Sequence, residues 1–202
     1  MQTGRPRHNM MKKSPLLLKT SQDWISAVLE DFDSFLLDHA AAEKKASGMA
    51  MSMLSHYPDR ISLVSQMADL AIEELTHYRE VLKWIHSRGN TIGPDKKDQY
   101  VLALRQHIRQ GSDVYLLDRL LIAAVIEARG AERFALIAQS LKPPQIKRFY
   151  ESLASSEARH YQLFLNLAEE YFAGEVTKTR WQQILDIEAK ILTELPIRAA
   201  LH

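Results

Sequence analysis

Cysteine is absent from the 202-residue sequence, and glycine and proline are sparse, with seven residues each. Without cysteine the chain cannot form disulfides, thiolate zinc sites, rubredoxin centres or iron–sulfur clusters. No apolar run reaches the roughly 18 residues that a membrane-spanning helix needs. The run Leu16–Leu18 is also too short for the apolar core of a signal peptide. We therefore expect a cytoplasmic chain with no membrane association.

An excess of one charge is also lacking, because 26 basic residues face 25 acidic ones and give a formal net charge of +1. The overall balance thus gives no evidence for a nucleic-acid partner. The charge is nevertheless uneven, since residues 1–20 contain five basic residues and no acidic one. Such a segment can bind phosphates, although its charge alone favours a solvated tail. We predict a flexible basic arm over residues 1–15 and a single ferritin-like domain over residues 16–202.

The motif Glu-x-x-His occurs twice in strongly helical runs, at Glu74 with His77 and at Glu157 with His160. Residues three apart on a helix lie on the same face, so the carboxylate and the imidazole can reach one point. A single motif of this kind is weak evidence, because such pairs often lie on solvated faces. Two copies in one chain carry more weight.

Each motif is preceded by a partner glutamate. Glu43 lies 31 residues before Glu74, and Glu127 lies 30 residues before Glu157. The two halves are offset by 84 residues for the partners (127 − 43) and by 83 for the motif glutamates (157 − 74). A glutamate followed by Glu-x-x-His, present twice, is the ligand set of a ferritin-like di-metal carboxylate bundle.

Apolar residues at alternating steps of three and four predict an all-α fold. The predicted helices cover about residues 21–55, 59–88, 112–140, 144–172 and 177–195. The first has an inward stripe that begins at Leu29. A long crossover over residues 90–112, with a short helix at 99–108, lets the second and third helices run parallel. The fold expected is a ferritin-like four-helix bundle with a long crossover between helices 2 and 3 and an extra C-terminal helix packed across the bundle.

The candidate ligands occupy positions where these stripes call for hydrophobic residues. Burying four glutamates without compensation would be prohibitive, and two divalent cations would balance their charge. Iron or manganese suits a set of carboxylates and imidazoles. If the motif glutamates bridge two metals, Glu43 pairs with His77 on one metal and Glu127 with His160 on the other. The alternative is that all six side chains lie on solvated helix faces.

Several neighbouring residues allow more than one interpretation. Glu132 is the rival to Glu127, but its stripe is far more polar, so we place it at the surface or in a supporting role. His39, one turn before Glu43, fits a core histidine with hydrogen-bond partners better than a ligand. Small residues along the stripes indicate either space for a substrate or close helix packing, and the sequence favours neither. They are Ala46, Ala50, Ala124 and Ala131.

Four segments resemble the bacterial tRNA 2-methylthio-N6-isopentenyladenosine hydroxylases. They are residues 36–46 (LLDHAAAEKKA), 73–78 (EELTHY), 126–134 (IEARGAERF) and 156–161 (SEARHY). The resemblance extends over about residues 16–195. It implies a non-haem di-iron monooxygenase that hydroxylates the isopentenyl side chain of the modified adenosine beside the tRNA anticodon. All six ligand positions that it implies are filled: Glu43, Glu74, His77, Glu127, Glu157 and His160.

The resemblance also implies cofactors and partners. The cofactors are two iron ions, for which manganese could substitute, and dioxygen is the co-substrate. Because the chain has no cysteine, the two electrons must come from an external donor, of the ferredoxin or flavin reductase type. Six basic residues are candidates for contact with tRNA phosphates. They are Lys12, Lys13, Lys44, Lys45, Arg129 and Arg133, of which the two arginines could instead pair with carboxylates such as Glu132.

Three other functions compete with this interpretation. The first is a ferritin-like iron-handling or peroxide-detoxifying protein similar to manganese catalase, although no additional acidic cluster for iron storage is evident. The second is a radical-generating subunit, which would carry a tyrosine one turn after a ligand histidine, where this chain has Val81 and Phe164. The third is a helical scaffold without chemistry, which the complete ligand set argues against.

Overall fold

A computed structural model describes residues 14–202, with the side chain of Asp113 excepted. The predicted basic arm, including Lys12 and Lys13, lies outside the described residues apart from its last two positions. Within the described part the chain forms seven α-helices and no strand. The helices are α1 (Gln22–Glu30), α2 (Phe32–His56), α3 (Ile61–Ser87), α4 (Gln99–Arg105), α5 (Ser112–Ser140), α6 (Pro144–Tyr171) and α7 (Gly174–Glu194).

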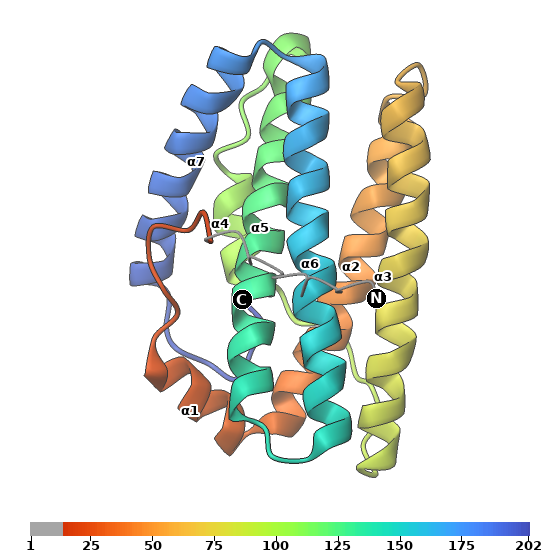
Figure 1. Cartoon of the computed structure of the whole chain (residues 1–202), viewed down its shortest axis with the longest axis vertical. Helices are drawn as coiled ribbons and strands as arrows, with labels where there is room; N and C mark the ends of the chain where they lie inside the picture. The colour runs from red at the N-terminus through yellow and green to blue at the C-terminus, as the bar shows by residue number, and fades with distance from the viewer. Residues whose placement is uncertain (1–13) are drawn as a thin grey trace, which may run out of the picture.

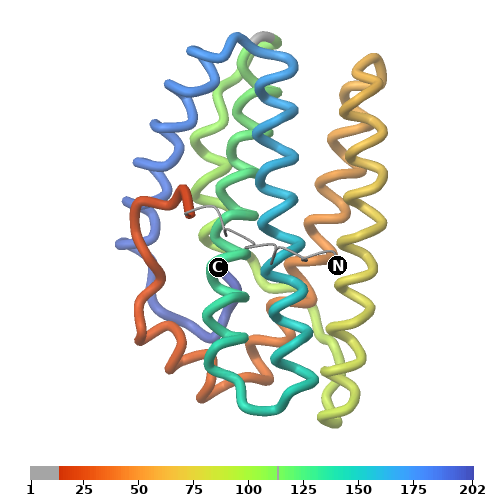
Figure 2. The backbone as a smooth tube through the Cα atoms, viewed as in Figure 1, coloured from red at the N-terminus to blue at the C-terminus, as the bar shows by residue number. Residues whose placement is uncertain are grey.

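Four long helices form the bundle, as two antiparallel hairpins that face each other (Figure 1). One hairpin is α2 with α3, and the other is α5 with α6. The segment between α3 and α5, which contains α4, returns along the bundle, so that α3 and α5 run in the same direction (Figure 2). This long crossover is the ferritin-like topology. The prediction of a ferritin-like all-α bundle is confirmed.

The first predicted helix is divided into α1 and α2, and the prediction of one continuous helix was wrong. Ser21 caps α1 by accepting a hydrogen bond from the Trp24 N–H at 3.3 Å. Asp31 leaves helical geometry (φ −127°, ψ 65°) and caps α2 by accepting from the Ser34 N–H at 3.1 Å. An aspartate that satisfies the free N–H groups of a new first turn favours a helix start at that position. Leu29, assigned to the inward stripe, is 44% exposed as a result.

The last helix differs in start and in orientation from the expectation. Helix α6 ends at Tyr171, and α7 begins at Gly174, three residues before the predicted start at 177. Helix α7 lies lengthwise on the outside of α5 and α4 instead of packing across the bundle (Figure 1). Its buried face includes Ile184, Leu185 and Ile191, which join the main core.

Three apolar clusters fill the interior, one on one side of a polar layer and two on the other. The first contains Met67 and Phe164, the second contains Phe35 and Phe134, and the third contains Val81. Burying a side chain of this size stabilises a fold by about 1.5–3 kcal/mol. Each bundle helix contributes buried side chains to clusters on both sides of this layer, and its acidic residue lies between them. The clusters therefore fix the four helices at the height of the candidate ligands.

Candidate metal centre

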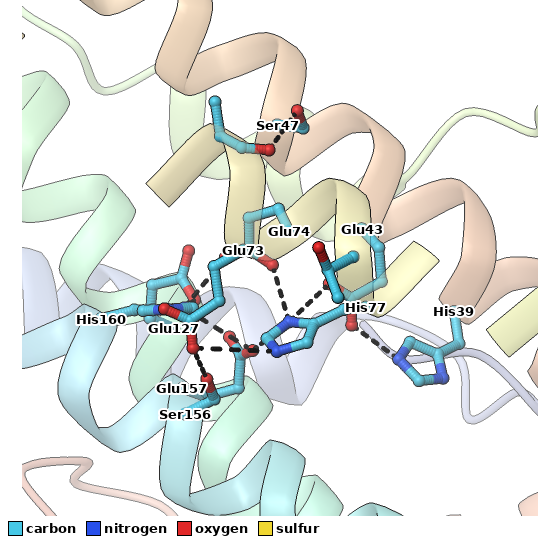
Figure 3. Close-up of polar contacts among 12 residues, drawn as sticks. His39, Glu43, Ser47, Glu73, Glu74, His77, Glu127, Ser156, Glu157 and His160 are labelled. Carbon is cyan, nitrogen blue, oxygen red and sulfur yellow. Dashed lines mark hydrogen bonds and ion pairs between the residues drawn. The ribbon is translucent and has the colours of Figure 1, made fainter. Parts of the chain in front are cut away.

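The six predicted side chains converge in the polar layer between the two hairpins (Figure 3). Helices α2 and α5 each contribute one glutamate, and α3 and α6 each contribute a Glu-x-x-His pair. The side chain of His77 is 14% exposed, and the other five are buried. The three-residue spacing of each motif directs both of its side chains to the same side of the helix, as expected.

Their ligand atoms form two overlapping groups, in each of which the atoms lie within 4.8 Å of one another. The first group is Glu43, Glu74, His77 and Glu157; the second is Glu74, Glu127, Glu157 and His160. The two motif glutamates thus belong to both groups, while each partner glutamate belongs to one. This geometry provides room for two cations that share two carboxylates.

The geometry around His160 fits a cation better than a hydrogen-bond network. Its Nδ1 lies 2.9 Å from Glu74 Oε1, but neither atom makes a hydrogen bond to any described residue. Glu157 Oε1 is also buried without a hydrogen-bond partner in residues 14–202. Buried polar atoms normally have partners. Lone pairs that converge without a proton between them are the donor set that a metal ion requires.

The electrostatics of the site point the same way. Burial raises the pKa of Glu43 and of Glu157. Burial also acts to raise the pKa of Glu74, but the nearby imidazoles of His160 and His77 outweigh it and lower that pKa. For His77, burial acts to lower the pKa, but Glu43 and Glu74 raise it to about 9. Four buried carboxylates are therefore unfavourable without a compensating charge, and two divalent cations would balance them.

The sequence interpretation missed Glu73, which lies behind both histidines (Figure 3). Each imidazole turns Nδ1 toward the candidate ligand glutamates and Nε2 toward Glu73. Glu73 Oε2 is 3.2 Å from His160 Nε2, and Glu73 Oε1 is 3.9 Å from His77 Nε2. A carboxylate at the second ring nitrogen is the usual support of a metal-binding histidine. The sequence signal for it was the pair of adjacent glutamates, Glu73 and Glu74, of which only Glu74 falls on the apolar stripe.

His39 is a fully buried core histidine with hydrogen-bond partners, as predicted. Its Nε2 is 2.7 Å from Glu43 Oε1, and its Nδ1 is 3.3 Å from the Tyr150 hydroxyl. Because a carboxylate only accepts, His39 donates from Nε2, and Nδ1 accepts from Tyr150. Glu43 is thus held by a buried chain of hydrogen bonds.

Two of the residues proposed to contact tRNA phosphates are buried, and those assignments were wrong. Arg129 is fully buried and pairs with Glu188, at 2.7 Å, and with Glu132. Arg133 is 5% exposed, donates to the Leu201 carbonyl and lies over the Trp24 ring. Local charge patterns could not show that α7 brings a carboxylate to Arg129.

The structure confirms the supporting role of Glu132, while the assignment of Lys44 and Lys45 to tRNA contacts stays a prediction. Glu132 supports the fold, because its carboxylate accepts hydrogen bonds from Thr20 and Arg129. Lys44 and Lys45 are exposed on α2; Lys44 pairs with Asp95 at 2.9 Å, and Lys45 donates to the Lys96 carbonyl at 2.7 Å. Both lysines therefore stay accessible to a partner.

A cavity of about 570 Å³ lies between α2 and α5 and reaches the candidate ligands. All four candidate ligand glutamates line it, whereas neither His77 nor His160 does. A substrate would therefore meet the carboxylate side of the centre. Among the small residues, Ala46 lines this cavity, while Ala50 and Ala124 are fully buried in close packing. Both interpretations of the alanine stripe thus hold, at different positions.

A helical bundle with a glutamate and a Glu-x-x-His motif from each hairpin defines a ferritin-like di-metal carboxylate protein. Its structure is similar to that of "Protein 43 with aldehyde deformylating oxygenase activity" from Synechococcus, with a TM-score of 0.88 and 34% identity over 93% of this chain and 94% of that one. The family model described as tRNA-(MS[2]IO[6]A)-hydroxylase (MiaE) matches residues 8–202. The chain belongs to this hydroxylase family, as the sequence resemblance implied.

Two relatives carry the name tRNA 2-(methylsulfanyl)-N(6)-isopentenyladenosine(37) hydroxylase. The protein from Pseudomonas putida is 40% identical over 152 residues, which cover 75% of this chain and 74% of the relative. The protein from Salmonella typhimurium is 30% identical over 180 residues, which cover 86% of this chain and 66% of the relative. In the described part of the chain, no helix has both the length and the apolar character needed to cross a bilayer.

Proposed function

We propose that this chain is a dioxygen-dependent di-iron monooxygenase that hydroxylates the isopentenyl side chain of 2-methylthio-N6-isopentenyladenosine beside the tRNA anticodon. The observation that carries the proposal is the cavity, which is lined by the four glutamates, by apolar side chains and by the exposed cations Lys45 and Arg105. Family membership and the names of the two relatives support the same substrate.

The residues that would hold the metals are Glu43, Glu74, His77, Glu127, Glu157 and His160. Two iron ions in this centre supply the activation of dioxygen, with electrons from a donor outside the chain. Iron suits the mixed oxygen and imidazole set, and manganese could bind the same donors. Glu73 and His39 orient the ligands from behind, leaving the side toward the cavity open.

The middle of the cavity suits an isopentenyl group. Ala46, Ile126 and Phe134 line it close to the glutamates. Apolar walls exclude water and bind a branched five-carbon chain at about 25 cal/mol per Å² of apolar surface buried. The alkyl group would then be directed toward the four glutamates, so that its terminal C–H bonds face the metals.

The cavity mouth suits a polyanion. Arg105 and Lys45 are exposed there, and half-buried Arg119 stacks over the Tyr115 ring at 5.8 Å. Such cations bind phosphates and position an RNA without reading its sequence. The target base would have to leave its loop to reach the centre. These cavity residues replace the buried Arg129 and Arg133 as candidate tRNA contacts.

The direct test is a single-turnover reaction. The iron-loaded, reduced chain is mixed with tRNA that carries the isopentenyl group but lacks the hydroxyl, dioxygen is added, and the nucleosides are analysed by mass. The expected product is the substrate nucleoside with one added oxygen atom. Iron oxidation with an unchanged nucleoside would contradict the proposal and favour the iron-handling or peroxide-detoxifying alternative. An aliphatic aldehyde in a parallel reaction tests the activity named for the Synechococcus protein.

A further inference from the structure

The segment 196–202, which follows α7, forms one wall of the cavity, and the proposed function assigns it no role. Leu201 and His202 both line the cavity, beside Asp98 and Val101 from the crossover. The side chain of His202 is only 5% exposed. A titratable ring is thus enclosed at the substrate cavity and belongs to neither group of candidate metal ligands.

Three hydrogen bonds fix the backbone of this segment. The Trp24 indole N–H donates to the Ala200 carbonyl at 3.0 Å, and the Leu201 N–H donates to Asp38 Oδ2 at 2.7 Å. The Arg133 guanidinium donates to the Leu201 carbonyl. These contacts come from α1, α2 and α5, so the wall is part of the folded core rather than a loose tail.

The ring of His202 is fixed as firmly as its backbone. It stacks on Tyr100 with 5.1 Å between ring centroids and 9° between planes. Its Nδ1 is 3.0 Å from Asp98 Oδ2, while Asp98 Oδ1 caps α4 by accepting from the Val101 N–H at 2.9 Å. Both carboxylate oxygens of Asp98 therefore have hydrogen-bond partners, and the bond to Oδ2 fixes the ring of His202.

The contact with Asp98 sets which ring nitrogen carries the proton. Burial acts to raise the pKa of Asp98, but the interactions with His202 and the Val101 N–H outweigh it and lower the pKa to about 2. An ionised carboxylate only accepts, so Nδ1 of His202 must be the donor. In the neutral imidazole, Nε2 then offers a lone pair.

That lone pair has no hydrogen-bond partner. Nε2 of His202 is buried and bonds to no group in residues 14–202. Buried polar atoms in folded proteins are almost always paired, with protein, water or ligand. Because His202 lines the cavity, its unpaired Nε2 is a candidate partner for a polar group of a bound substrate.

We infer that His202 is a specificity-determining residue that accepts a hydrogen bond from the N6–H of the isopentenyl adenine. The inference rests on the proposed function. Alkylation leaves a single N–H on that nitrogen, directly beside the isopentenyl chain, and the ring nitrogens of the base only accept. An acceptor on the wall of the cavity therefore recognises the junction between the base and its side chain.

The test compares two anticodon stem-loop RNAs in the single-turnover reaction of the iron-loaded chain. One carries 2-methylthio-N6-isopentenyladenosine, and the other carries the 2-methylthio-6-isopentenyloxy purine, in which oxygen replaces the N–H. The wild-type chain should prefer the first by about 100-fold in kcat/KM, because a site built to accept from an N–H rejects an analogue without it. His202→Phe keeps the stacking on Tyr100 but should reduce the preference to within about threefold, mainly by raising KM for the first RNA.

Two further variants separate recognition from stability. His202→Gln, whose amide can reach the position of Nε2, should restore part of the preference. Ile197→Ala changes an exposed side chain of the same segment that does not line the cavity, and it should leave the preference intact. The inference is overturned if His202→Phe keeps the wild-type preference, or if Ile197→Ala loses it equally. If the wild-type chain oxidises neither RNA, the proposed function fails as well; hydroxylation with no preference refutes the inference alone.

Discussion

The half-site on α2 and α3 (Glu43, Glu74 and His77) and the half-site on α5 and α6 (Glu127, Glu157 and His160) present the same side chains in different surroundings. Four residues before the partner glutamate, the first half-site has His39 and the second has Ala123. His39 bonds to Glu43 at 2.7 Å, whereas Ala123 lines the cavity. The same helical position thus braces a ligand in one half and makes space in the other.

Two more equivalent positions follow this pattern. Glu73, directly before the first motif, supports both histidines, while its equivalent Ser156 donates a hydrogen bond to Glu73 itself. Three residues after the partner glutamate, Ala46 is matched by Gly130, whose Cα faces Glu157. The first half-site therefore supplies the support for the whole centre. All four carboxylates line the cavity, but those of the second half-site lack a supporting hydrogen bond such as that of His39 to Glu43, and they are freer to adjust when a substrate binds.

The largest expected effect comes from the shared glutamates. Glu157→Ala removes a side chain that belongs to both ligand groups, so iron content should fall from about two ions per chain to near zero, with loss of hydroxylation. Glu132→Gln is the matched control on α5, because Glu132 pairs with Arg129 and should not bind metal. The iron content of both purified variants, measured per chain, tests this prediction. Loss of iron in Glu132→Gln would mean that α5 presents Glu132 to the metals in place of Glu127.

Removing the common support should have the next largest effect. Glu73→Gln weakens the carboxylate behind His77 and His160, and activity should fall about 10- to 100-fold, as for other supports of metal-bound histidines. Ser156→Ala removes only a partner of Glu73 and should cost less. Iron content and single-turnover rates of the two variants test this order. Equal losses would show that the two halves share the support evenly.

Loss of the brace behind Glu43 should be smaller. His39→Ala leaves the Tyr150 hydroxyl and Glu43 without their buried partner, which should destabilise the metal-free chain by about 1–3 kcal/mol. Thermal and urea unfolding measure this change, and titration with ferrous iron should show weaker binding of one ion. The corresponding change in the second half, Ala123→Gly, should leave iron affinity unchanged. If it weakens iron binding as much as His39→Ala does, the asymmetry proposed here is wrong.

The smallest effect is expected at Gly130. A Cβ there would lie 3.6 Å from Glu157 Cγ, which is ordinary van der Waals contact. Gly130→Ala should stabilise α5 by about 0.5–1 kcal/mol, because alanine favours a helix. It should also restrict Glu157 and slow hydroxylation by about threefold, a small barrier increase, with iron content unchanged. An unchanged rate would show that Glu157 does not need to move.

The sequence predicted what depends on local periodicity. Helix α5 was bounded correctly, and the inward glutamates were recognisable because they interrupt apolar stripes. The break at Asp31 was missed because a capping aspartate and an exposed helical aspartate look alike in sequence. Contacts between distant segments were also invisible. The pairing of Arg129 with Glu188 and the placement of His202 on the cavity depend on how α7 and the residues after it pack on α5.

The central claim is that two metals share Glu74 and Glu157 between the two half-sites. Anomalous diffraction at the iron edge, from crystals of the iron-loaded chain, tests it most directly. The account predicts two peaks, one among Glu43, His77 and the shared carboxylates, and one among Glu127, His160 and the same carboxylates. A single peak, or a peak outside these six side chains, would contradict the account.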